Sequence, residues 1–158
     1  LGMIGPDAVL PLVEPLLNSD NVTIRGSCAK ALAQVAVNHP EVPFPIEGLE
    51  GLKTSLNDPN PVVHIASVMA LGEIGTQAYD ILVEALQTTD NVALQVAIVN
   101  ALASLGDIRA ADLLAALSND ESADSYVRES ATSALPRLEQ TIKFKEINAQ
   151  RFSSKETP

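Results

Sequence analysis

Hydrophobic residues recur along this chain at helical spacing, and the same set of them returns at intervals in the thirties. The copies begin with leucines that are 31, 39, 31 and 33 residues apart: Leu1, Leu32, Leu71, Leu102 and Leu135. An aliphatic residue lies eight positions before each of the later four leucines, and another lies three positions after it. These offsets place the side chains on one face of a helix with 3.6 residues per turn. Each copy therefore predicts an amphipathic helix, here called a signature helix.

An alanine comes directly before the leading leucine in each of the four later copies. These alanines are Ala31, Ala70, Ala101 and Ala134. So small a residue at a repeated position indicates that two helices approach closely, because a larger side chain would push them apart. We therefore expect the signature helices to be tightly packed at these alanines.

Glycine closes the signature helix in three copies, at Gly5, Gly75 and Gly106. Because glycine adopts a left-handed backbone without steric cost, we expect the chain to leave the helix at these residues. Leucines then follow each glycine by seven and eleven positions, which again lie on one helical face. They predict a second helix, here called a leucine helix, and they are Leu12, Leu16, Leu82, Leu86, Leu113 and Leu117.

Each leucine helix is expected to end in a polar turn that contains an aspartate. These turns lie around Asp20, Asp58, Asp90 and Asp120, and their side chains can cap the next signature helix. Pro61 suits the first position of such a helix. The unit is therefore a helical hairpin, too small to bury its own hydrophobic face. We predict an all-α fold, an α-solenoid of about four hairpins over residues 1–138, the first of them incomplete.

The turn aspartate, the aliphatic residue followed by arginine, and the Ala-Leu-Gly-x-Ile-Gly ending together resemble HEAT repeats. The short period and the Leu-Gly-x-Ile-Gly ending are similar to the subgroup found in phycobilisome lyases and related cyanobacterial proteins. The resemblance implies a ladder in which turn aspartates pair with helix arginines of neighbouring units. The arginine position holds Arg25, His64, Gln95 and Arg128 in successive copies. The resemblance therefore implies a ladder that is broken in the middle two repeats.

The composition agrees with close-packed helices, since 46% of the residues are hydrophobic and 3% are aromatic. No apolar run approaches the roughly 20 residues that a transmembrane helix needs, so we expect no membrane insertion. One cysteine excludes an internal disulfide framework and suits a reducing compartment, which predicts a cytoplasmic protein. Cys28 lies on the expected buried face, where a small hydrophobe is favoured over a catalytic thiol.

The net charge of −10, with a pI near 4.5, argues against nucleic acid as a partner, because phosphate backbones would be repelled. Acidic residues gather on the expected solvent side of the leucine helices: Glu14, Glu47, Glu50, Asp80 and Glu84. If these helices line the concave face of the solenoid, the residues form an acidic groove for a basic protein partner. The alternative is an ordinary solvated surface that keeps the protein soluble.

The sequence shows no constellation of residues that points to catalysis, a metal or a cofactor. Neither His39 nor His64 has cysteine, histidine or carboxylate neighbours at metal-ligand spacing. Because His64 replaces a ladder arginine, we expect it to have a hydrogen-bonded structural role. The acidic stretch 120–124 lacks the glycine and terminal glutamate of a calcium loop and predicts a lengthened turn. We therefore expect a protein that is not an enzyme.

Two regions depart from the repeat. The segment 38–45 contains three prolines, which forbid a helix, and it places Val42 and Phe44 at alternate positions. These two side chains either pack on the neighbouring leucine helix or contact a partner. Residues 139–158 form a tail, part of which is expected to cap the end of the core, with a disordered end at 153–158.

The chain begins abruptly, because Leu1 already corresponds to the leading leucine near the end of a signature helix. We therefore expect further repeats of the same chain upstream, or a dimer surface on the exposed flank if Leu1 is the natural start. The combined features predict a non-catalytic protein-binding scaffold or adaptor. An alternative, carried by the family resemblance, is a bilin lyase subunit or a phycobilisome disassembly factor. A third is a structural subunit of a larger assembly.

Overall fold

The structure of the chain is a computed structural model that describes residues 5–155. Leu1, the leading residue of the first copy, therefore lies outside the described residues. Within them the chain forms α-helices joined by turns, together with two short 3-10 helices, η1 (Pro6–Ala8) and η2 (Thr76–Ala78). The α-helices are α1 (Val9–Asn18), α2 (Val22–Asn38), α3 (Ile46–Ser55), α4 (Pro61–Ile74), α5 (Tyr79–Thr88), α6 (Val92–Leu105), α7 (Arg109–Ser118) and α8 (Ser125–Lys155).

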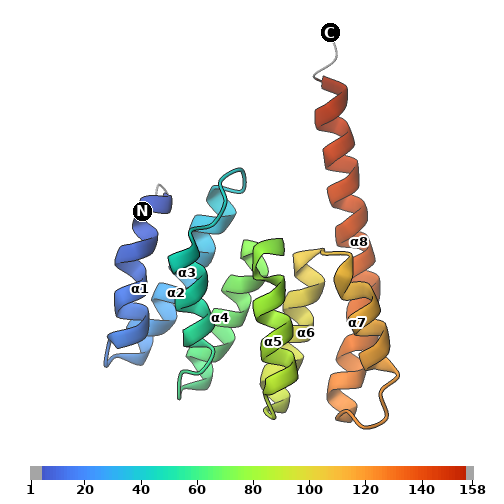
Figure 1. The fold of residues 1–158 in the computed structure, drawn as a ribbon, viewed down its shortest axis with the longest axis horizontal. Coiled ribbons are helices and arrows are strands. Elements are labelled where there is room, and N and C mark those ends of the chain that lie inside the picture. The colour runs from blue at the N-terminus through green and yellow to red at the C-terminus, as the bar shows by residue number, and fades with distance from the viewer. Residues whose placement is uncertain (1–4, 156–158) are drawn as a thin grey trace.

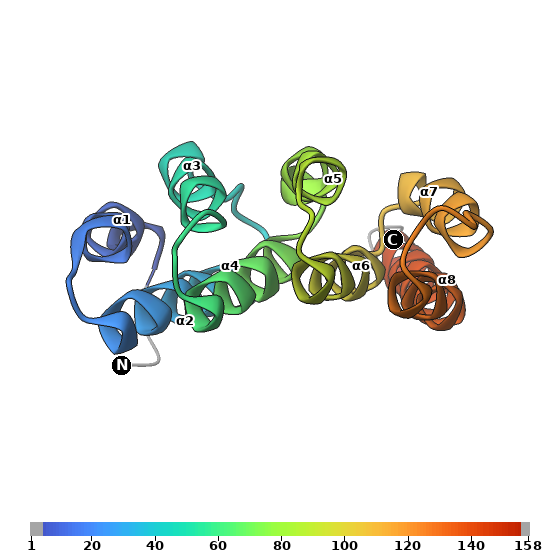
Figure 2. The ribbon, with the colours of Figure 1, turned by 90° about the horizontal axis from the view of Figure 1, so that it is seen from below.

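The helices stack side by side into an elongated array of two rows (Figures 1 and 2). One row, the signature row, contains α2, α4, α6 and α8, and the other, the leucine row, contains α1, α3, α5 and α7. Each helix of one row is followed in the chain by a helix of the other. The all-α solenoid that the periodicity predicts is therefore confirmed.

The two rows are packed differently. Neighbouring signature helices contact one another extensively along the whole array, whereas among the described leucine helices only α1 and α3 do so. Figure 2 shows the leucine helices standing further apart than the signature helices. Because the more closely spaced layer lies on the inside of a curve, the signature row forms the concave side. The condition for an acidic groove, that the leucine helices line a concave face, is therefore not met.

The leading leucines and their partners form the core between the two rows. Leu32, Leu71 and Leu102 are fully buried, as are Leu16 and Leu82 of the leucine helices. Ile24 departs from the predicted core face and is 44% exposed. Its neighbour Gly26 faces Val62 of α4, so Ile24, two residues earlier on the helix, points away from that neighbour.

Glycine and asparagine set the helix ends. Gly75 and Gly106 have φ angles of 95° and 70°, so both leave their helices as predicted. Gly5 does not, since its φ of −96° is extended backbone ahead of η1. Side chains of the polar turns cap the next signature helix: Asn21 caps α2, Asn60 caps α4 beside Pro61, and Asn91 caps α6.

Part of the tail covers the core as expected, since Ile142 packs against it, but residues 153–155 are helical where a disordered end was expected. Residues 139–155 continue α8 as one helix, which extends beyond the other helices in Figure 1. Glu139 takes the place of the glycine that ends α4 and α6, so no left-handed residue interrupts the helix. Ser153–Lys155 are helical, and residues 156–158 lie outside the described residues. Near the array, Lys145 Nζ donates to the Leu105 carbonyl at the end of α6.

Candidate binding surfaces

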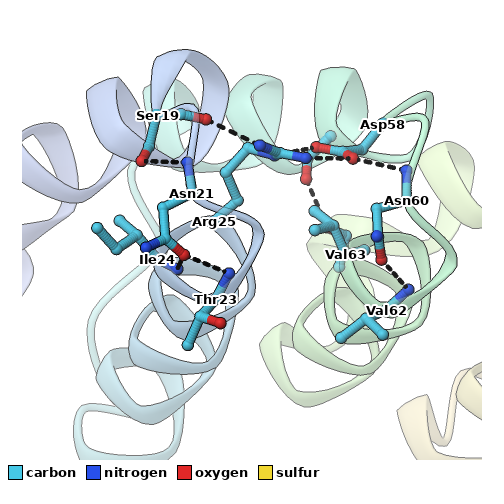
Figure 3. A network of polar contacts seen from close by, with 11 residues as sticks. Ser19, Asn21, Thr23, Ile24, Arg25, Asp58, Asn60, Val62 and Val63 are labelled. Atoms are coloured by element: carbon cyan, nitrogen blue, oxygen red, sulfur yellow. Dashed lines mark hydrogen bonds and ion pairs between the residues drawn. The ribbon is translucent and has the colours of Figure 1, made fainter.

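The first repeat junction contains a complete rung of the ladder (Figure 3). Arg25 of α2 donates from Nε and Nη2 to the two carboxylate oxygens of Asp58, at 2.7 and 3.2 Å. Its Nη1 donates to the Ser19 carbonyl at 2.8 Å. Burial alone would raise the pKa of Asp58, but hydrogen bonds from Arg25 and the Asn60 backbone outweigh it and lower that pKa. The rung therefore joins two successive repeats by a charge-assisted, bidentate pair.

The later junctions lack that rung, as the sequence predicts. Gln95 Nε2 donates to the Thr89 carbonyl at 2.9 Å. This bond corresponds to the one from Arg25 to the Ser19 carbonyl, but within residues 5–155 Gln95 makes no bond to the aspartate of the following turn. His64 Nε2 is buried without a hydrogen-bond partner among the described residues, so the expected hydrogen-bonded role is wrong. A cavity of about 430 Å³ lies beside His64 and is also lined by Asp90 of the next turn. The shorter side chain thus leaves open space between the second and third repeats.

The five predicted acidic residues are all exposed, and they lie on the leucine row as the sequence predicts. Two of them already pair across neighbouring repeats. Glu84 accepts from Lys53 at 3.2 Å, and Asp80 lies 3.8 Å from Arg109, whose guanidinium also stacks over the Tyr79 ring. The other three, Glu14, Glu47 and Glu50, project from α1 and α3 and have no ion pair among the described residues. The acidic residues therefore cover a convex surface rather than a groove.

The two candidate contact residues of the proline-rich insertion, Val42 and Phe44, have different environments. Phe44 is 6% exposed and lies so close to Gly48 that an added Cβ there would meet its ring, so of the two alternatives Phe44 takes the packed one. Its backbone N–H donates to Gln77 Oε1 at 2.8 Å, and Gln77 Nε2 donates back to its carbonyl at 3.3 Å. Val42 remains 42% exposed at the rim of a cavity of about 440 Å³. The insertion is thus held against the array by the buried ring of Phe44 and by its backbone hydrogen bonds to Gln77.

A surface that the sequence analysis did not single out lies on the signature row, where α4 carries two exposed apolar side chains. Val62 and Met69, seven residues apart, are 61% and 64% exposed. Met69 lines a cavity of about 330 Å³ between α4 and α6, with a mostly apolar wall. The lining residues are Ile65, Met69, Gly72, Glu73, Ala97, Asn100, Ala101 and Ser104. The sequence could have indicated this surface, because α4 carries hydrophobic residues on all sides and not only on its core face.

A second cavity of about 470 Å³ adjoins the first one at Ser104, between α6 and α8. It is lined by Phe144, which is 65% exposed, and by Arg137. Arg137 Nη2 donates to Asn100 Oδ1 at 2.6 Å and so crosses the space between the two cavities. The concave side therefore offers a continuous, largely apolar surface with one guanidinium on it.

The cysteine and the carboxylates offer little for chemistry. Cys28 is 7% exposed, and burial raises the pKa of its thiol, which disfavours the reactive thiolate. Among residues 5–155, no three histidine, cysteine or acidic side chains are grouped so that they could hold a metal ion. Within the same range, no helix is long and apolar enough to cross a membrane.

Comparison with known proteins shows to which family the chain belongs. A family model described as HEAT repeats matches residues 49–136. The chain is 62% identical over 145 residues to the uncharacterized phycocyanin operon protein Z of Pseudanabaena tenuis, covering 92% of this chain and 72% of that protein. It is 30% identical over 143 residues to the bilin biosynthesis protein CpeZ of a Synechococcus species, covering 87% and 76%. The chain belongs to the HEAT-repeat family.

These relatives also confirm the resemblance to the phycobilisome lyase-type subgroup of HEAT repeats. Within this HEAT-repeat array, the ladder is complete only at the first of the described junctions. At the junctions that lack a rung, neighbouring signature helices are in close contact. For example, a Cβ added to Gly72 would lie only 3.2 Å from the Ala101 Cβ. Adjacent repeats are thus held in place mainly by their signature helices.

Proposed function

We propose that this HEAT-repeat chain is a non-catalytic, cytoplasmic scaffold that binds a phycobiliprotein subunit while a bilin is attached to it. The names of its relatives, a phycocyanin operon protein and a bilin biosynthesis protein, support the pathway. The observation that supports a binding role is the concave surface around Met69. An exposed, contiguous apolar surface is unusual on a soluble protein unless it meets a partner.

The geometry of that surface suits a protein partner. The apolar wall beside Met69 can accept an apolar side chain, while Glu73, Asn100 and Ser104 supply hydrogen-bonding groups around it. The unpaired charges of Glu14, Glu47 and Glu50 lie on the opposite row, so we assign them a role in steering a basic region of the partner, with little direct contact.

The lack of a catalytic role is supported by Cys28, which is buried with a raised thiol pKa. A bilin lyase acting alone would need an exposed nucleophile or a base close to the chromophore. His39 is partly exposed, but its nearest carboxylate, Glu41, is 3.9 Å away and mostly solvated. Catalysis, in this proposal, belongs to another component.

The test uses purified apo-phycocyanin subunit, free bilin and this chain. The wild-type chain should bind the apo-subunit in size-exclusion chromatography and should form no covalent bilin adduct by itself, judged by the visible spectrum after denaturation. Met69→Glu should weaken binding at least about tenfold, because a charge would be buried at the centre of the contact.

Ile108→Glu provides the matched control, since Ile108 is also an exposed apolar residue, 71% accessible, but lies at the start of the leucine helix α7. It should bind like the wild type. Equal losses in both variants would remove the concave surface from the proposal. A covalent adduct formed by the chain alone would show that the non-catalytic assignment is wrong.

A further inference from the structure

Arg128 occupies the same register position in α8 that Arg25 occupies in α2. Each follows the aliphatic residue that lies eight positions before the leading leucine, and each lies just after a polar turn. Arg25 is saturated by the carboxylate of Asp58 from the following repeat. Arg128 has no following repeat among the described residues, and its side chain makes no hydrogen bond within them.

The guanidinium of Arg128 is nevertheless partly sequestered. Its Nε is shielded from solvent and has no acceptor. A buried N–H that neither protein nor water accepts is unfavourable, and it is more so when the group is charged. The local structure therefore holds an arginine in a place where an acceptor is missing.

An open cavity of about 500 Å³ lies beside Arg128, and polar side chains line it: Ser118, Ser125, Arg128, Glu129, Thr132 and Ser133. The hydroxyls of Ser118 and Thr132 already donate to backbone carbonyls. Those of Ser125 and Ser133 make no hydrogen bond within residues 5–155, so both remain able to donate. Ser125 lies one helical turn before Arg128, so its hydroxyl and the guanidinium can donate to one acceptor group, whereas Ser133 lies about 12 Å from Ser125 along the helix and serves a different part of the cavity.

The charges around the cavity limit what can bind. Asp120 lies close enough to Arg128 for that positive charge to contribute to lowering its pKa, but its carboxylate accepts from Ser122. Glu129 lines the cavity and is exposed. These two negative charges disfavour a multiply charged anion. The geometry of the Arg25 rung favours a planar group that takes two parallel hydrogen bonds, which is a carboxylate.

We propose that Arg128 and Ser125 form a binding site for a single carboxylate group that the described residues do not supply. Two sources present this chemistry: an aspartate or glutamate side chain of a protein, and a propionate of a linear tetrapyrrole. The site is distinct from the concave surface around Met69, and its existence does not depend on the proposed function.

The experiment follows the ¹H–¹⁵N signals of the arginine Nε–H groups during titration of the intact chain. The Arg128 signal is assigned by its disappearance in Arg128→Lys. Sodium acetate should shift it in a saturable manner, while sodium chloride at equal ionic strength should not. The Arg25 signal, already paired with Asp58, serves as the internal reference and should stay in place. N-acetyl-aspartate amide and biliverdin then represent the two sources, and the tighter of the two identifies which one the site prefers.

Two variants make the test decisive. Glu129→Gln should tighten acetate binding about two- to fivefold, because it removes one exposed like charge from the cavity. Asp58→Ala should make Arg25 respond to acetate as Arg128 does, provided that circular dichroism shows the chain folded. An Arg128 signal that moves no more than that of Arg25, or that moves equally with chloride, would overturn the proposal.

Discussion

The two helix rows join the same successive repeats by different means. In the signature row the junction between α4 and α6 is a contact of small residues, with Gly72 against Ala101. In the leucine row α3 and α5, and then α5 and α7, are linked by the long charged side chains of Lys53 with Glu84 and of Arg109 with Asp80. One row is close-packed, and these two junctions of the other row are bridged by exposed ion pairs.

The difference shows where neighbouring repeats are specified. Close-packed interiors respond to a change of one methylene group, whereas exposed ion pairs contribute little and are screened by salt. The signature row therefore sets the spacing and curvature of the array. The leucine row can vary its charges with little effect on the fold.

The largest effect is expected from overfilling the signature row. Ala101→Leu should destabilise the chain by about 1–3 kcal/mol, because Ala101 lies where α4 and α6 approach closely at Gly72, and a larger side chain there would push the two helices apart. Chemical denaturation measures this as a lower midpoint. Ala93→Leu on the same helix is the matched control, since Ala93 is exposed, and it should change the stability by less than about 0.5 kcal/mol. Equal midpoints for both variants would contradict the packing argument.

The next effect concerns the ladder. Asp58→Asn should cost about 1.5 kcal/mol, because it removes the charge from a partly buried, bidentate hydrogen-bonded pair. Asp90→Asn alters the corresponding aspartate of the next turn, which faces His64 in place of arginine, and should be nearly neutral. Urea denaturation of both variants measures the contrast. A similar loss in both would mean that the turn aspartates act through something other than the arginine.

The same rung predicts a dependence on pH. The folded-state pKa of Asp58 lies below its ordinary value of 3.8. Its contribution is therefore complete above that value and is lost as the pH falls through the lower, folded-state pKa. The stability difference between wild type and Asp58→Asn should be constant from pH 7 to about pH 5 and should shrink below pH 3.8. Urea midpoints over this range test it, and a difference that grows in acid would reverse the assigned sign.

Completing the broken rung should have a smaller, stabilising effect. His64→Arg is expected to reach Asp90 across the cavity between the second and third repeats and to add about 0.5 kcal/mol. A double-mutant cycle with Asp90→Asn isolates the pair. If the gain persists when Asp90 is changed, it comes from filling the cavity rather than from a new rung.

The smallest effect is expected in the leucine row. Lys53 and Glu84 are 45% and 60% exposed, so their coupling in a double-mutant cycle should be about 0.2–1 kcal/mol and should fall at high salt. Replacing the unpaired Glu14, Glu47 and Glu50 by glutamine should likewise leave the fold intact. If those charges steer a partner, the triple variant should slow association and leave dissociation unchanged, which stopped-flow binding at two salt concentrations would resolve.

The sequence by itself determined the repeated, local features of this protein. The hairpin unit, the buried leucines, the glycine exits at Gly75 and Gly106 and the polar caps all depend on residues within one or two helical turns of each other, and periodicity exposes them. The extension of α8 was not predicted, although Glu139 stands where three of the copies have glycine.

Only the tertiary structure decided the features that depend on contacts between different helices and repeats. It placed the signature row on the inside of the curve, since that follows from the relative spacing of helices and not from either helix alone. It buried Phe44 while leaving Val42 exposed, and the ring of Phe44 fits because Gly48 has no Cβ to collide with it. It also left the Nε of Arg128 without an acceptor among residues 5–155, whereas the Nε of Arg25 donates to Asp58.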